Sequence, residues 1–243
     1  MSDYGYGPSD DKGGSGSSSS SGDSGLAASP PPTGGNIQFD IPLLPQEIKA
    51  RKHALLCSIG FLVLLPLGVL VARYTRTWNR FWFWNHATIQ LLASGPVIFY
   101  GWALGQQLAS DFDLEDLHDP HQKIGIALLA VYVTQLAIGV FIHFVKFPKI
   151  FPGGLMRNPL NYIHALLGLA ILGLAAYQVH YGLYIEWIFF TGGLHKVPDS
   201  AKHAWLALII VFWVLYTLGL AFLPKQFKQE TKKPAPPMEK EVA

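Results

Sequence analysis

Four histidines begin four apolar segments of this 243-residue chain, and their type and spacing could bind metal: His53, His86, His121 and His164. Neutral imidazole is a common metal ligand. If each apolar segment crosses a membrane, the chain reverses direction at each crossing. His53 and His121 then lie near one face, and His86 and His164 near the other. Two pairs at two levels are what two stacked metal cofactors would need.

The third and fourth segments share a pattern displaced by 43 residues. The matching residues are His121, Gly125, Gln135 and Gly139 in one and His164, Gly168, Gln178 and Gly182 in the other. In a helix these offsets fall within about 40° of the histidine direction, so each helix presents one stripe. Close packing explains the glycines and interhelical hydrogen bonds explain the glutamines. Neither explains why a histidine leads both stripes.

The arrangement in pairs favours haem iron over zinc. A structural zinc site usually needs four close ligands, whereas haem iron takes two axial ligands that facing helices can supply. Two imidazoles leave no open position on the iron, which favours electron transfer over oxygen chemistry. A proton relay or a transporter remains an alternative for histidines within a membrane.

The remaining five histidines have weaker claims as ligands. His118 and His195 fall in loops, and His203 begins the fifth apolar segment. His180 lies on the same side as His53 and His121, and His143 on the opposite side, so both are rival ligands. Neither begins a repeated stripe, and hydrogen bonding to a cofactor or proton transfer are other roles for them.

The composition predicts the elements that position these residues. Half of the residues are hydrophobic and only 14% are charged, a mix typical of a multi-span membrane protein. Five runs are long enough to cross a hydrocarbon core of about 30 Å: residues 54–72, 84–108, 124–145, 162–184 and 204–223. Membrane spans satisfy their backbone as helices. The sequence therefore predicts an all-α integral membrane bundle of five transmembrane helices, four of them forming a haem-binding core.

The two ends of the chain differ from this core. Residues 1–48 are rich in Gly, Ser, Asp and Pro, and they are predicted to be a disordered low-complexity tail. The transmembrane domain is predicted over residues 49–225, followed by a disordered tail over 226–243. No apolar core of a cleavable signal peptide is present, so the first span is expected to direct insertion. A net charge of +2 gives no indication of nucleic acid.

Basic residues near the spans predict the orientation. Ten Lys and Arg flank the face where the first span ends, and six flank the opposite face, which also carries the acidic loop 111–119. The positive-inside rule then favours a cytoplasmic C-terminus and an extracytoplasmic N-terminus in a multi-pass protein of the plasma membrane or an endomembrane.

Short stretches around all four histidines resemble the core helices of cytochrome b561 domains. They read HALL at His53, NHATIQ around His86, HQKIG at His121 and HALLG at His164, with LPLG and ARY completing the first helix. The resemblance covers about residues 50–225 and includes a fifth, non-ligating helix that ends in LPKQ. It is strongest for the fungal branch in which this domain follows an extracellular haem-binding DOMON domain. Here the first 50 residues contain no DOMON domain.

The resemblance implies a transmembrane oxidoreductase with two b-type haems. By motif position, His53 and His121 hold the outer haem, and His86 and His164 the inner one. Members of the family move electrons from cytoplasmic ascorbate to monodehydroascorbate, to ferric chelates or to a haem protein. The lipid bilayer and a second copy of the chain are further expected partners. The alternatives are a quinol-linked membrane-anchor cytochrome b and a non-redox transporter.

Cations on the inner side are candidates to contact the haem propionates or ascorbate, which is an anion at neutral pH. They are Arg73, Arg80, Lys149 and Arg157. Arg73 and Arg80 are favoured because they precede His86. The alternative is that these residues only set the orientation of the protein. No catalytic residue beyond these is predicted.

Overall fold

A computed structural model describes residues 41–114, 119–145 and 159–231, and all of its regular elements there are helical. In chain order the α-helices are α1 (Pro45–Ile59), α2 (Leu65–Thr75), α3 (Trp82–Thr88), α4 (Gly95–Asp111), α5 (Pro120–Phe144), α6 (Pro159–Tyr181), α7 (Trp187–Phe190), α8 (Asp199–Gly219) and α9 (Leu223–Thr231). Three π-helical turns, η1 (Gly60–Leu64), η2 (Ile89–Ser94) and η3 (Gly182–Glu186), and a 3₁₀ turn η4 (Leu220–Phe222) connect some of them without a break. The predicted all-α class is confirmed.

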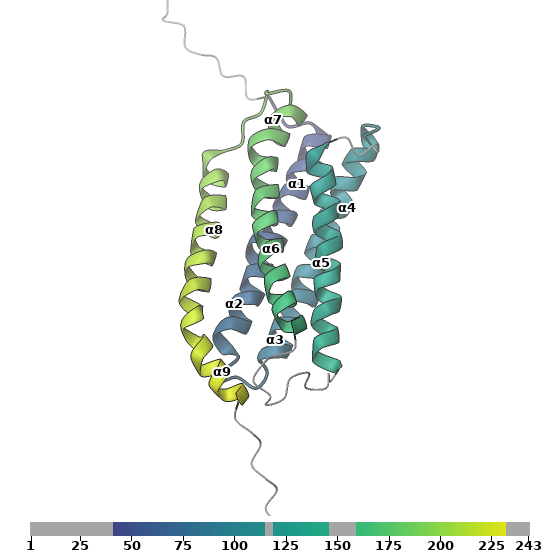
Figure 1. The fold of residues 1–243 in the computed structure, drawn as a ribbon. Coiled ribbons are helices and arrows are strands. Elements are labelled where there is room, and N and C mark those ends of the chain that lie inside the picture. Colours follow the sequence, from purple (N-terminus) through teal and green to yellow (C-terminus); the bar gives the residue numbers. More distant parts are fainter. Residues whose placement is uncertain (1–40, 115–118, 146–158, 232–243) are drawn as a thin grey trace, which may run out of the picture. The chain divides into compact units, whose positions relative to one another are not determined.

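The helices join into five rods that are long and apolar enough to cross a membrane: Pro45–Thr75, Trp82–Asp111, Pro120–Phe144, Pro159–Phe190 and Asp199–Gln229. Each contains one of the five predicted spans almost entirely, so the predicted number of spans is confirmed. Consecutive rods run in opposite directions (Figure 1). We call the end of the bundle where α1 begins the upper end and the end where α2 stops the lower end, as drawn in Figure 1.

Proline and acidic residues start the helices at the upper end. Pro45 and Pro120 occupy first-turn positions of α1 and α5, where a missing N–H costs nothing. The Asp119 carboxylate accepts a 2.9 Å hydrogen bond from the backbone N–H of Gln122 and so caps α5. The Glu47 carboxylate accepts a 2.7 Å bond from the Leu44 N–H. These contacts fix the first turns of the helices next to His53 and His121.

Two of the π turns are explained by proline within a span. Pro66 is the second residue after η1, and Pro96 is the second residue after η2. A proline ring in a regular α-helix clashes with the carbonyl four residues earlier, and a wider π turn relieves the clash. Carbonyls near these turns find side-chain donors: Leu65 O accepts from Gln90 Nε2 at 3.2 Å, and Gln90 O accepts from the Tyr132 hydroxyl at 2.8 Å. The η1 and η2 turns lie against each other.

Glycines allow the helices that carry the histidines to approach closely. A Cβ on Gly60 would lie 2.5 Å from Ile98 Cγ1, and a Cβ on Gly101 would lie 2.8 Å from Cys57 Sγ. The α1–α4 contact is therefore as close as small-residue packing in membranes allows. Helix α5 packs on α6, and α8 packs on α2 and α6. Cys57, the single cysteine, is partly buried, in agreement with its predicted place in the first span.

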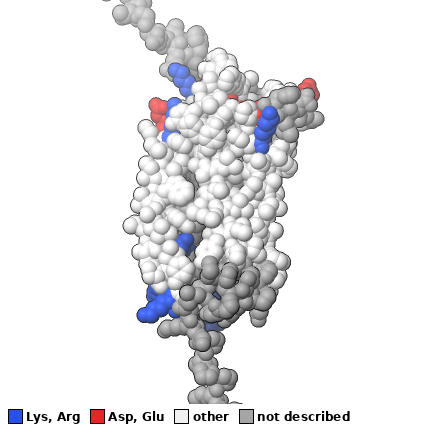
Figure 2. Space-filling view, in the orientation of Figure 1, with Lys and Arg blue, Asp and Glu red and all other residues white. Residues whose placement is uncertain are grey.

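Charged side chains gather at the two ends of the bundle. On the face drawn in Figure 2, acidic and basic side chains lie together at the upper end and basic ones at the lower end, with a largely uncharged surface between them. At the upper end Lys49 pairs with Asp111, and His195 Nδ1 lies 3.0 Å from Glu47 Oε1. The spans between the two ends expose many large hydrophobic side chains, which is what lipid contact requires.

Helical structure extends past both predicted boundaries of the domain. Helix α1 begins at Pro45 rather than at residue 49, because the proline and Glu47 stabilise its first turn. Helix α9 continues to Thr231 rather than ending at residue 225. Gln226 of α9 is 6% exposed, and Gln229 donates a 2.9 Å hydrogen bond to the Thr77 carbonyl, which fixes α9 against the α2–α3 loop. The remaining parts of both predicted tails, residues 1–40 and 232–243, lie outside the described residues.

Candidate cofactor site

The four histidines that begin the apolar segments meet in two pairs. The ring centres of His53 and His121 are 6.2 Å apart near the upper end. Those of His86 and His164 are 6.4 Å apart near the lower end. The rings in each pair are nearly perpendicular, at 76° and 80°. The structure thus brings together the residues that the alternating topology pairs in the sequence.

One ring in each pair has its orientation fixed by a backbone carbonyl. Nδ1 of His53 donates to the Gly101 carbonyl at 2.7 Å, and Nδ1 of His86 donates to the Gly68 carbonyl at 2.8 Å. A neutral imidazole that carries its proton on Nδ1 leaves a lone pair on Nε2, the form that binds a metal. The partner rings differ, because Nδ1 of His121 and of His164 is buried with no hydrogen-bond partner among the described residues.

Glycines leave the room that three of these rings occupy. A Cβ on Gly105 would lie 2.8 Å from His53 Cε1, and a Cβ on Gly139 would lie 3.0 Å from His164 Cε1. A Cβ on Gly182 would lie 3.4 Å from His121 Cε1. Gly139 and Gly182 are the last members of the two repeated stripes. In the antiparallel α5–α6 pair, each stripe ends beside the histidine that begins the other.

The spacing within each pair fits one metal atom held by two imidazoles. A metal that bonds one nitrogen of each ring at about 2 Å would separate the ring centres by about 6 Å. No group of three or more His, Cys, Asp or Glu that could hold a metal occurs among the described residues. Each pair supplies two imidazoles at this spacing, and haem iron needs only two axial ligands from the protein.

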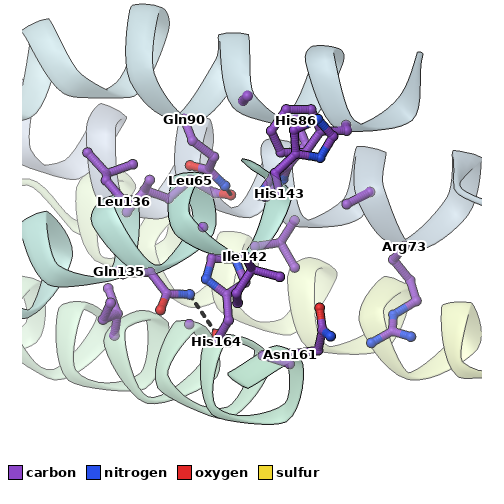
Figure 3. Close-up of a pocket in the computed structure, with 18 of the residues that line it drawn as sticks. Leu65, Arg73, His86, Gln90, Gln135, Leu136, Ile142, His143, Asn161 and His164 are labelled. Carbon is purple, nitrogen blue, oxygen red and sulfur yellow. Dashed lines mark hydrogen bonds between the residues drawn. The ribbon is translucent and has the colours of Figure 1, made fainter. Parts of the chain in front are cut away.

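A cavity of about 410 Å³ opens beside the lower pair and contacts His86 and His164. Its volume lies in the range of about 300–1,000 Å³ typical of cofactor and ligand pockets. Figure 3 shows both histidines with Gln90, Gln135 and Leu136 around this space, and Arg73 at one side of it. Gly139 and Gly168 also line it, so the glycines of the stripes widen the cavity. Apolar walls with a few polar groups suit a flat macrocycle.

The four cations proposed from the sequence to contact propionate or ascorbate do not share one place. Arg73 is partly buried and lines the lower cavity. Arg80 is exposed, its guanidinium lies 4.7 Å from the Phe81 ring centre, and it does not line the cavity. Lys149 and Arg157 lie outside the described residues.

The competing histidines have other neighbours. His143 lines the lower cavity but stacks on Phe83, with ring centres 3.3 Å apart. His180 stacks on Tyr184 with ring centres 4.4 Å apart and lies near Trp205 of α8. His195 pairs with Glu47. His118 lies outside the described residues.

Several residues that line the lower cavity were not singled out from the sequence. Asn161, Tyr216 and Gln226 are among them. Asn161 precedes His164 by three residues, so helical spacing alone could have placed it on the same face. Tyr216 and Gln226 come from the α8–α9 rod, which carries none of the four histidines in pairs, and no local pattern points to them.

An antiparallel bundle of apolar helices with histidine pairs inside it is the arrangement of a class of protein, the membrane-spanning haem proteins. The sequence profile of eukaryotic cytochrome b561 matches residues 52–190, which include all four paired histidines. The chain belongs to this family of transmembrane oxidoreductases, whose members bind b-type haem.

Curated relatives carry the same domain within longer chains. Three proteins of Arabidopsis thaliana named cytochrome b561 and DOMON domain-containing protein are 30%, 31% and 24% identical over 72%, 55% and 58% of this chain. The matches span 40%, 31% and 36% of those relatives. The chain therefore matches well under half the length of each. No solved structure gives a significant match.

Proposed function

We propose that the protein carries electrons across a membrane through two b-type haems, one held by His53 and His121 and one by His86 and His164. The observation that carries this proposal is the pair of ring-centre separations, 6.2 Å and 6.4 Å, at opposite ends of one bundle. Each spacing suits a metal held between two imidazoles.

A haem with two imidazole ligands supplies one-electron transfer at a closed iron. The residues of the chain control its surroundings. The carbonyls of Gly101 and Gly68 hold the rings of His53 and His86 with Nε2 unprotonated. Buried side chains such as Ile98 and Tyr132 exclude water from the space between the two levels, since they are 1% and 2% exposed.

We propose that electrons enter at the lower end. The lower cavity is lined by Arg73 and Arg76 and attracts an anionic donor, and ascorbate is the donor that fits the family. The acceptor at the upper end is monodehydroascorbate, a ferric chelate or a haem protein. The basic residues Arg73, Arg76 and Lys228 favour a cytoplasmic lower end, and hence a cytoplasmic C-terminus.

The purified protein tests this function directly. We expect a b-type spectrum that ascorbate reduces, with two haems per chain by pyridine haemochrome assay. Protein that folds but binds no haem contradicts the proposal. Reduction by a quinol but not by ascorbate favours a quinol-linked cytochrome instead.

The orientation has its own test. In sealed vesicles of known sidedness, a cysteine introduced at Gln229 should react only with reagent on the cytoplasmic side. A cysteine introduced at Leu194 of the α7–α8 loop should react only from the opposite side. Cys57 is replaced by serine in both variants. Reaction from the reverse sides would contradict the proposed direction of electron transfer.

A further inference from the structure

Helix α8 contributes no histidine to either pair, yet it contacts the lower cavity through Tyr216. Arg73 Nη2 of α2 donates a 2.8 Å hydrogen bond to the Tyr216 hydroxyl. The Arg73 guanidinium carbon also lies 4.9 Å from the centre of the Tyr216 ring. The tyrosine is 9% exposed, so the guanidinium is held by a buried group with two kinds of contact.

Gly219, one helical turn after Tyr216, makes room for the stem of the same arginine. A Cβ at Gly219 would lie 2.5 Å from Arg73 Cγ and 3.3 Å from Cδ. The aliphatic part of Arg73 therefore passes directly over the backbone of α8, while Tyr216 holds its head. Two positions of α8, one helical turn apart, thus determine where the Arg73 side chain of α2 can lie.

Among the side chains that the structure describes, no carboxylate pairs with the guanidinium of Arg73. The carboxylates whose side chains the structure describes all lie at the upper end of the bundle (Figure 1). They are Glu47, Asp111, Asp113, Asp119, Glu186 and Asp199. Arg73 Nε is buried and has no hydrogen-bond partner in the part of the chain that the structure describes. A partly buried cation without a counter-ion is unfavourable, and within a membrane segment such a residue usually has a functional role.

We propose that Tyr216 is a positioning residue that holds the Arg73 guanidinium at the lower cavity, where its remaining N–H groups bind an oxygen anion. This proposal rests on the proposed function. The anion is a carboxylate or enolate oxygen, and two sources share this chemistry: a propionate of the lower haem and the anionic donor. Nitrogen donors of guanidinium suit both, since they form charge-assisted hydrogen bonds with anionic oxygen.

The test compares three variants with one control. Tyr216→Phe removes the hydroxyl and keeps the ring, and Tyr216→Leu removes both contacts. Gly219→Ala keeps the Tyr216 side chain but displaces the stem of Arg73, and its methyl group would also lie 3.2 Å from Tyr74 Cε2. Tyr74→Phe is the control, because the Tyr74 hydroxyl donates a 2.6 Å bond to the Leu215 carbonyl across the same α2–α8 interface. The readouts are the midpoint potential of the lower haem in a mediated redox titration, the KM and kcat for ascorbate, haem content and thermal unfolding.

If the anion is the propionate, we expect the midpoint potential of the lower haem to fall in Tyr216→Leu and Gly219→Ala, since a positive charge nearby favours the reduced haem. If the anion is the donor, we expect the KM for ascorbate to rise about fivefold or more with kcat little changed, as for loss of a charged hydrogen bond. Tyr216→Phe should show a smaller change of the same kind. The control should keep the wild-type potential and KM.

Wild-type potential and KM in both Tyr216→Leu and Gly219→Ala would overturn the positioning role. Equal changes in Tyr74→Phe would overturn it too, because a general loosening of the α2–α8 contact would then be sufficient. If Tyr216→Leu fails to fold, Tyr216→Phe and Gly219→Ala decide the outcome. Wild-type protein without haem, or one that ascorbate does not reduce, counts against the proposed function itself and is identified before any variant is measured.

Discussion

The side-chain amide of Gln178 on α6 donates a 2.7 Å hydrogen bond to the main-chain carbonyl of His121 on α5. The relationship recurs with the helices exchanged, since Gln135 Nε2 donates to the His164 carbonyl at 2.6 Å. Each glutamine of the repeat thus holds the helical turn that carries the opposite histidine. The 43-residue sequence repeat therefore corresponds to a reciprocal pair of hydrogen bonds between the antiparallel helices α5 and α6.

Replacing Gln178 by Leu should destabilise the upper pair more than the lower one. The His121 carbonyl would lose its side-chain donor in an apolar interior, at a cost of about 1 kcal/mol. We expect a lower midpoint temperature of thermal unfolding and loss of the upper haem at a lower temperature. Haem absorbance recorded during heating measures both. Gln106→Leu, at an exposed position of α4, is the control. Equal effects of the two substitutions would contradict a role for the hydrogen bond.

Adding one methyl group at Gly105 should displace the His53 ring. The new Cβ would lie 2.8 Å from Cε1 and 2.9 Å from Nδ1 of that ring, and such overpacking costs about 1–3 kcal/mol. We expect Gly105→Ala to retain less than the full haem content, with the loss confined to the upper site. Gly173→Ala is the matched control, because no described atom beyond its chain neighbours and its own helix backbone lies within 4 Å of its Cβ position. Full haem content in Gly105→Ala would contradict this prediction, because the His53 ring would then tolerate displacement without loss of haem.

Removing one imidazole of the lower pair should abolish one haem and spare the other. We expect His86→Ala to bind about half of the wild-type haem, with the spectrum of the upper site retained. His143→Ala should keep both haems, because His143 stacks on Phe83 rather than facing the pair. Haem counts and low-temperature electron paramagnetic resonance distinguish the two sites. If His143→Ala loses a haem and His86→Ala keeps both, His143 rather than His86 is the ligand of the lower haem.

Tyr132 should stabilise the bundle through its hydroxyl. This group donates to the Gln90 carbonyl at 2.8 Å, and Tyr132 is almost fully buried. Tyr132→Phe leaves that carbonyl without the donor, so we expect a loss of about 1–3 kcal/mol in the free energy of unfolding. Unfolding in a detergent titration measures the change. Tyr100→Phe, with Tyr100 60% exposed, should be close to neutral.

Apolar length and alternating direction predict the rods and the level of each histidine. They leave His180 and His143 as rivals, and the 43-residue repeat and the family resemblance favour the two pairs. They do not predict the π turns, since the effect of Pro66 and Pro96 depends on which wider turn the neighbouring helix can accommodate. Nor do they predict the role of Tyr216. Its contact with Arg73 joins positions 143 residues apart, and only packing of α8 on α2 brings them together.

The η1 turn also sets the angular phase of everything that follows it in the first rod. Each residue advances a helix by about 100°, so a chain lacking one residue of Gly60–Leu64 would restart α2 rotated by about that angle. Gly68 would then turn its carbonyl away from His86, and Arg73 would face a different side of the bundle. The extra residue accommodated by η1 therefore sets the rotation of α2 about the rod axis relative to α1.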